Sequence, residues 1–161
     1  MNNFKKISLL PKWGEVERAR RTTARFLISH ELSEDTVNSV TMVISELTEN
    51  AIKYGNFKKA KDKVKVSIHI FESDIMAEVV NPVAVSDYRH LKRLDQTIQW
   101  IRGFQDPFEA YVEKLKEVSR RSFEDEESGL GLVRIAYEGR AILDFYVGDN
   151  DILNVSAISN K

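Results

Sequence analysis

Three polar residues, Glu46, Asn50 and Lys53, have types and a spacing that suit phosphate chemistry. They are four and then three positions apart, so a helix would present all three on one face. The amide oxygen of Asn50 can bind magnesium, which prefers oxygen ligands. The carboxylate of Glu46 can accept a proton, and the ammonium of Lys53 can neutralise phosphate charge. Taken alone, the pattern is weak and favours a solvated helix face that carries an amide and two charges.

A second pattern, Ser128-Gly129-Leu130-Gly131-Leu132, stands where a helix is predicted to begin. Glycines at that point let backbone N–H groups approach an anion closely, and a helix N-terminus favours negative charge. The hydroxyl of Ser128 would add a further donor. Because a Gly-x-Gly pair also occurs in ordinary turns, a purely structural turn is the alternative.

Hydrophobic periodicity predicts the elements that must position these residues. Ser33 is expected to cap the second helix, and Gly55 to end it in a left-handed conformation. Runs of helices and hairpins, without regular βαβ alternation, predict an α/β (α+β) two-layer sandwich, in which helices cover one face of a mixed, mostly antiparallel sheet. The predicted helices cover residues 13–32, 33–54, 91–101, 108–118 and 128–139, and the predicted strands cover 4–10, 64–70, 75–80, 142–147 and 153–157.

The composition excludes several classes of function. A length of 161 residues suits a single domain over 1–161. With 24 basic and 25 acidic residues the net charge is −1, so no overall field attracts nucleic acid or anionic lipid. The sequence has no cysteine, which excludes disulfides, cysteine-bound zinc and a thiol nucleophile. No window approaches about 20 apolar residues, so we expect no membrane span and a location in the cytoplasm.

Together the two patterns resemble the N box and the second glycine box of the GHKL family of ATPases. This family has the Bergerat ATP-binding fold and includes gyrase and the histidine kinases. The N box corresponds to residues 45–55, and the resemblance covers about residues 33–159. The small size of the chain resembles the stand-alone branch of the family, which contains the anti-sigma-factor serine kinases.

The resemblance implies a role for each matching residue. Glu46 matches the general base, which acts on water or on an acceptor serine. Asn50 matches the ligand of Mg2+, and Lys53 falls where several relatives place a residue that contacts phosphate. A long helical insertion over residues 84–127 takes the place of the ATP lid. The residues implied in binding Mg-ATP are Asn50, Lys53, Asn81, Ser128, Gly129, Leu130, Gly131 and Leu132.

One segment departs from the family pattern. The family carries an Asp followed by Gly-x-Gly after the central hairpin, and this Asp accepts a hydrogen bond from adenine. Here Asn81 stands near the expected Asp, and no glycine follows it. An Asn oxygen can still accept this hydrogen bond, although more weakly than a carboxylate. The insertion is rich in apolar helix-forming residues, which indicates a packed helical element or a docking surface instead of a mobile flap.

Two functions remain open from the sequence. The first is an ATP-binding regulatory protein that works by partner switching and sequesters or phosphorylates a small protein, by analogy an anti-sigma antagonist. The alternative is a non-catalytic protein-binding module that has the same fold and has lost nucleotide. Retention of Glu46 and Asn50 favours the first function, and the altered segment at Asn81 favours the second. A homodimer through the first helix or a sheet edge is a further expectation.

Overall fold

The computed structural model describes residues 2–84, 86, 88–121 and 129–161. Within these residues five strands form one sheet in the order β1-β2-β3-β5-β4. The strands are β1 (Phe4–Leu9), β2 (Val64–Ile70), β3 (Asp74–Pro82), β4 (Ala141–Gly148) and β5 (Ile152–Asn160). Every pairing in this described part is antiparallel, where the sequence predicts a mixed, mostly antiparallel sheet. The reason is that β5 lies between β3 and β4, which run in the same direction but do not pair.

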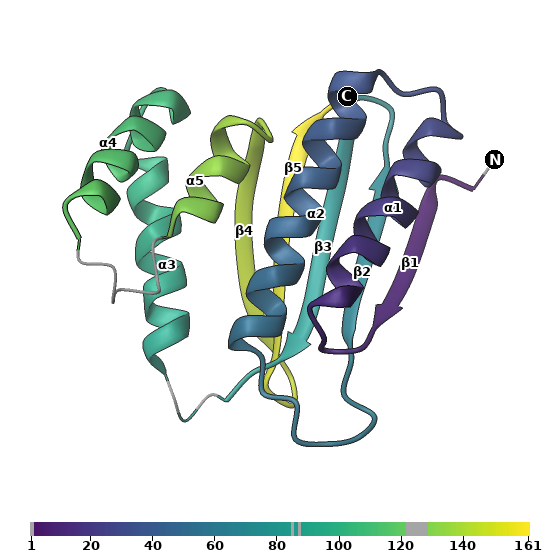
Figure 1. Cartoon of the computed structure of the whole chain (residues 1–161), viewed down its shortest axis with the longest axis horizontal. Coiled ribbons are helices and arrows are strands. Elements are labelled where there is room, and N and C mark those ends of the chain that lie inside the picture. The colour runs from purple at the N-terminus through teal and green to yellow at the C-terminus, as the bar shows by residue number, and fades with distance from the viewer. Residues whose placement is uncertain (1, 85, 87, 122–128) are drawn as a thin grey trace.

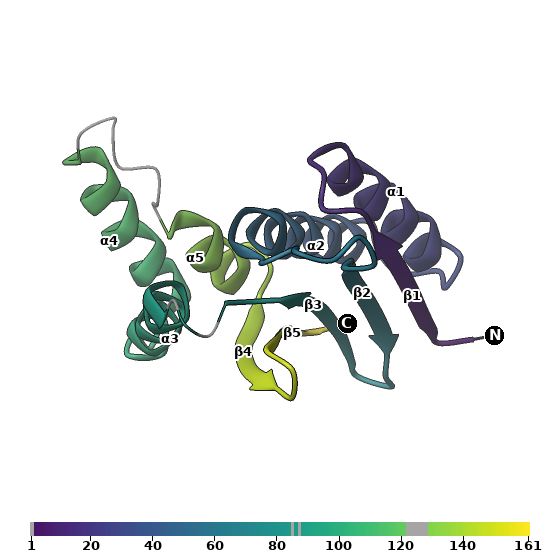
Figure 2. The same cartoon turned by 90° about the horizontal axis from the view of Figure 1, so that it is seen from below.

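Helices cover one face of this sheet, as the sequence predicts (Figure 1). The helices are α1 (Gly14–Ile28), α2 (Glu34–Tyr54), α3 (Tyr88–Arg102), α4 (Pro107–Ser119) and α5 (Leu130–Tyr137). Seen from below, α1, α2 and α5 lie on the same side of the strands, and α3 and α4 lie beyond β4 (Figure 2). The core fills the space between α2 and the sheet, where Ile44 and Leu47 are buried with Val66, Ile68 and Val79.

Local signals set the bounds of α2. Ser33 caps the helix, and its side chain accepts a hydrogen bond from the Thr36 N–H at 3.2 Å. The prediction of a left-handed Gly55 is wrong, because this residue is extended at φ −69° and ψ 156°. The glycine serves close packing instead. A Cβ at Gly55 would lie 2.5 Å from the carbonyl oxygen of Ala51 and would also clash with the Phe57 ring.

The insertion contains a packed helix. Leu94, Ile98 and Ile101 of α3 are all buried in the core. The C-terminal end of α3 is fixed to the edge of the sheet, because Arg102 Nη2 donates a hydrogen bond to the Leu143 carbonyl at 2.6 Å. The N-terminal end contacts α2. Helix α3 therefore packs against the rest of the fold at the edge of the sheet. Of the two possibilities that the sequence allows, a packed helical element and a docking surface, α3 corresponds to the packed helical element.

None of the helices in the described residues combines the length and the apolar character needed to cross a membrane.

Candidate functional site

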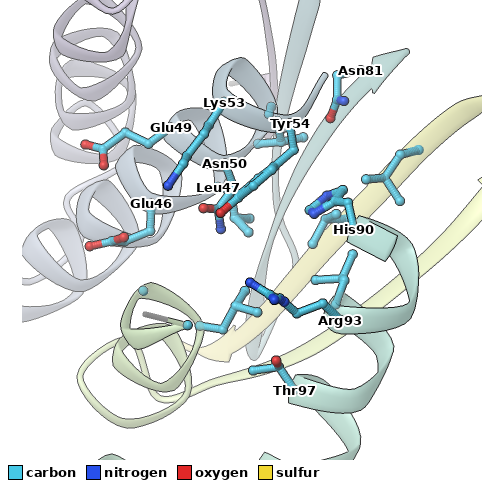
Figure 3. A pocket seen from close by; sticks show the side chains of 18 of the residues that line it. Glu46, Leu47, Glu49, Asn50, Lys53, Tyr54, Asn81, His90, Arg93 and Thr97 are labelled. Atoms are coloured by element: carbon cyan, nitrogen blue, oxygen red, sulfur yellow. The ribbon is translucent and has the colours of Figure 1, made fainter. Parts of the chain in front are cut away.

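A cavity of about 290 Å³ lies between the C-terminal half of α2, helix α3, the start of α5 and strands β3 and β5 (Figure 3). Its volume is close to the lower end of the range for small-molecule sites, about 300–1,000 Å³. The cavity has apolar and polar walls. The apolar lining residues are Leu47, Ala51, Val79, Leu94, Leu132, Leu153 and Val155.

Helix α2 brings the three predicted polar residues to this cavity. Glu46, Asn50 and Lys53 all line it, and Figure 3 shows them on one side of the helix. The helix is amphipathic, so Ile44 on another face is fully buried against the core. The spacing of four and three residues therefore gives the shared face that the sequence predicts.

The glycine turn meets the same cavity from α5. Gly129 caps this helix in the left-handed conformation, at φ +66°, which glycine adopts at little cost. Gly131 permits a close approach between helices, because a Cβ there would lie 2.5 Å from Glu46 Oε2. Gly129, Gly131 and Leu132 line the cavity. Leu130 packs partly buried against the core instead, and Ser128 lies outside the described residues.

Glu46 has a partner that the sequence did not reveal. Its Oε1 accepts a hydrogen bond from Arg134 Nη1 of α5 at 2.9 Å. Arg134 Nε also donates to Glu138 Oε2 at 2.8 Å. The hydrogen bond that Arg134 donates to Glu138 and the negative charges of Glu138 and Glu46 raise the pKa of Arg134. A possible sequence signal was an Arg one turn into the helix that follows the glycines, with a Glu four positions later.

Glu49 is a second carboxylate at the cavity that the sequence analysis missed. Burial raises the pKa of Glu49, and the negative charge of Glu46 raises it further, while Arg134 opposes the shift. Its position three residues after Glu46 is the signal that could have found it, because that spacing puts both carboxylates on one face.

Asn81 reaches the cavity from β3 and is buried. Its Nδ2 donates a hydrogen bond to the Pro82 carbonyl at 3.0 Å, which leaves Oδ1 as the acceptor of this side chain. Nearby, the ring of His90 stacks on Tyr54, with centroids 4.2 Å apart and planes 12° apart. His90 and Arg93 project from α3 toward α2 (Figure 3). Their three-residue spacing inside the insertion was the only sequence signal for them.

The residues of this cavity fit a magnesium–polyphosphate ligand. Asn50 supplies an amide oxygen, Lys53 a cation, and the Gly129–Gly131 turn supplies backbone without side-chain bulk. Across the described ranges, no group of three or more His, Cys, Asp or Glu side chains could hold a metal ion. Magnesium that is bound with phosphates commonly takes few protein ligands, and Asn50 offers an amide oxygen of the kind that it prefers.

Comparison with known proteins identifies the family and the fold. A family model described as the histidine kinase-like ATPase domain matches residues 10–136, most of the chain. The chain belongs to this family. A chain in the crystal structure of the SiaB–SiaC complex from Pseudomonas aeruginosa has the same fold, with a TM-score of 0.72. The two are 20% identical over 98% of this chain and 90% of that chain. No curated protein matches the sequence.

Proposed function

We propose that this chain is a GHKL-type, ATP-binding regulatory protein that acts as a serine-kinase-like partner switch. The observation that carries the proposal is the convergence of two segments around one cavity. Glu46, Asn50 and Lys53 come from α2, and Gly129 and Gly131 come from α5. Membership of the histidine kinase-like ATPase family supports the same assignment.

Each of these residues has a task in binding Mg-ATP. Asn50 donates an oxygen to the metal, and Lys53 offers positive charge to the phosphates. Backbone N–H groups at the start of α5 face the anion, and the helix dipole favours it. When bound, magnesium would neutralise charge that develops on the phosphate oxygens.

Phosphate transfer then needs one base. The hydroxyl oxygen of an acceptor serine forms a bond to the γ-phosphorus, and the bond from this phosphorus to the bridging oxygen breaks. ADP leaves with that electron pair, and Glu46 accepts the hydroxyl proton. Oε1 of Glu46 is held by Arg134, so Oε2 is the oxygen we assign to the proton. Water in place of serine would give hydrolysis.

We propose a small protein as the partner, either an acceptor of phosphate or a sequestered antagonist of the anti-sigma type. A neighbour in fold comes from a two-protein complex, which supports this assignment by analogy. For a homodimer we favour α1 over the sheet edges. Both edges already have a carbonyl bound by an arginine, since Arg18 donates to Ser8 and Arg102 donates to Leu143.

A second candidate is a non-catalytic protein-binding module, and specific contacts favour it. Asn81 donates a hydrogen bond to Pro82, and the His90 ring stacks on Tyr54, at the place where the family binds adenine. Such a module would bind its partner through the insertion. Phe108 and Leu115 of α4 are exposed there.

Calorimetric titration with Mg-ATP separates the two functions. We expect the wild type to bind, and Asn50→Ala to lose about 10-fold or more of the magnesium-dependent affinity. The matched control is Asn38→Ala, an exposed asparagine on the same helix, which should bind as the wild type does. Absence of heat and of any thermal shift with millimolar nucleotide would sink the ATP-binding proposal and leave the protein-binding module.

A further inference from the structure

Arg134 joins helix α5 to the carboxylate that faces the cavity. The ion pair with Glu46 connects residues 88 positions apart, at 2.9 Å. The side chain of Glu46 is 19% exposed and that of Arg134 is 43% exposed, so water reaches this contact mainly from the arginine side. Arg134 is itself held from its other side by Glu138, one turn later on α5. A guanidinium fixed by two carboxylates loses less conformational freedom for each contact than one in an isolated pair.

Both oxygens of the Glu46 carboxylate consequently face helix α5. Oε1 accepts from Arg134, and Oε2 lies against the backbone of Gly131, where even a methyl group would clash. Such confinement fixes the direction in which Oε2 can accept a proton. In general-base catalysis a third group commonly holds the base in this way, and misplacement by about 1 Å can cost 100-fold in rate.

We propose that Arg134 is a positioning residue, which orients Glu46 so that Oε2 meets the acceptor hydroxyl. The inference rests on the proposed function and deepens it, because it assigns to α5 a second task besides its glycine turn. Arg134 is not among the described residues that line the cavity. Its loss should therefore slow turnover and leave nucleotide affinity unchanged.

The test compares Arg134→Met and Arg134→Lys by steady-state release of phosphate from Mg-ATP, together with calorimetric nucleotide affinity. We expect Arg134→Met to lower kcat by about 10- to 100-fold, with KM and the nucleotide Kd within about twofold of wild type. Lysine keeps a charged donor, so Arg134→Lys should recover part of the loss. Arg20→Met is the matched control, since it breaks an exposed Arg–Glu pair of similar length on α1. It should change neither quantity.

Each other result has a distinct meaning. An unchanged or higher kcat in Arg134→Met would overturn the positioning role, and so would a loss of nucleotide affinity equal to the loss of kcat. A wild type that binds Mg-ATP without turning it over would overturn the positioning role and keep the ATP-binding part of the proposed function. A wild type that does not bind Mg-ATP would overturn both, and the binding titration identifies that case before any variant is compared.

Discussion

The two ends of the cavity follow the family pattern to different degrees. One end is where the family binds phosphates, and we call it the phosphate end. The residue types that the family pattern predicts are present there and line one cavity: Glu46, Asn50 and the Gly129–Gly131 turn. The other end is where the family binds the adenine base, and we call it the base end. There Asn81 replaces the acidic residue of the family, and His90 stacks on Tyr54. If the chain binds ATP as we propose, this difference predicts that it still binds the phosphates and recognises the adenine base differently from the family pattern. A nucleotide bound here would owe most of its affinity to its phosphates.

The largest expected effect is at the phosphate end. Glu46→Gln should lower turnover of Mg-ATP by about 100- to 10,000-fold, because the amide cannot accept the proton. Nucleotide binding should persist, since the Gln oxygen can still accept from Arg134. Rapid phosphate-release assays beside calorimetry measure both quantities. Turnover equal to that of the wild type would show that Glu46 is not the general base. The phosphate end would then depart from the family pattern as well.

A side chain added at Gly131, at the same end of the cavity, should have the next largest effect on turnover. Gly131→Ala would place a Cβ 2.5 Å from Glu46 Oε2 and displace the carboxylate. We expect turnover to fall by up to about 100-fold, with little change in the free energy of unfolding, because the clash is with the far end of a flexible side chain and alanine favours a helix over glycine. Gly14→Ala is the control, because a Cβ there meets nothing within 4 Å. Normal turnover in Gly131→Ala would show that the close approach of the two helices is not needed.

At the base end, Asn81→Asp restores the acidic residue that the family carries. We expect destabilisation by about 1–3 kcal/mol at pH 7, because a buried carboxylate oxygen would replace the N–H that donates to Pro82. Urea unfolding measures this change. Asn154→Asp, on the uncovered face of the neighbouring β5, should cost much less. If Asn81→Asp unfolds like the wild type and binds adenine nucleotide more tightly, the base end is less altered than we infer.

The smallest expected effect concerns Glu49, which lies beside Glu46 at the phosphate end (Figure 3). Its pKa is raised above the ordinary value of 4.5, first by burial and then by Glu46. The folded protein therefore holds this proton more tightly than the unfolded chain, and stability is lost as the pH rises through the raised pKa. At pH 7, Glu49→Gln should raise the free energy of unfolding by less than about 0.5 kcal/mol, which a slightly higher melting temperature would show. Near pH 4 the substitution should not raise the melting temperature. Glu72→Gln, in an exposed turn, serves as the control. A gain that is equal at both pH values would contradict the assignment.

Elements with strong periodicity were predictable from the sequence. The alternation over 64–70 gives β2, and the apolar stripe with the Ser33 cap gives α2. The shared face of Glu46, Asn50 and Lys53 follows from helical geometry alone, so these side chains could be grouped before the fold was known.

Features that depend on tertiary packing were not predictable. Arg134 meets Glu46 only because α5 packs against α2, and helical periodicity carries no information about that approach. The stack of His90 on Tyr54 similarly requires α3 to turn back to α2. Gly55 was assigned to a turn conformation, whereas its actual constraint is the position of the Phe57 ring.

The position of β5 also bears on how the chain folds. This strand lies inside the sheet, where its residue Ile152 pairs with Pro82 of β3. In the sequence these two residues are separated by α3, α4, α5 and β4. Closing so long a loop costs entropy before any pairing is gained. The local hairpin of β2 and β3 can form early, but it leaves the inner edge of β3 open until the β4–β5 hairpin docks. During that interval the open edge is a site for aggregation, so the last strand in the sequence is also the one that protects the nascent sheet.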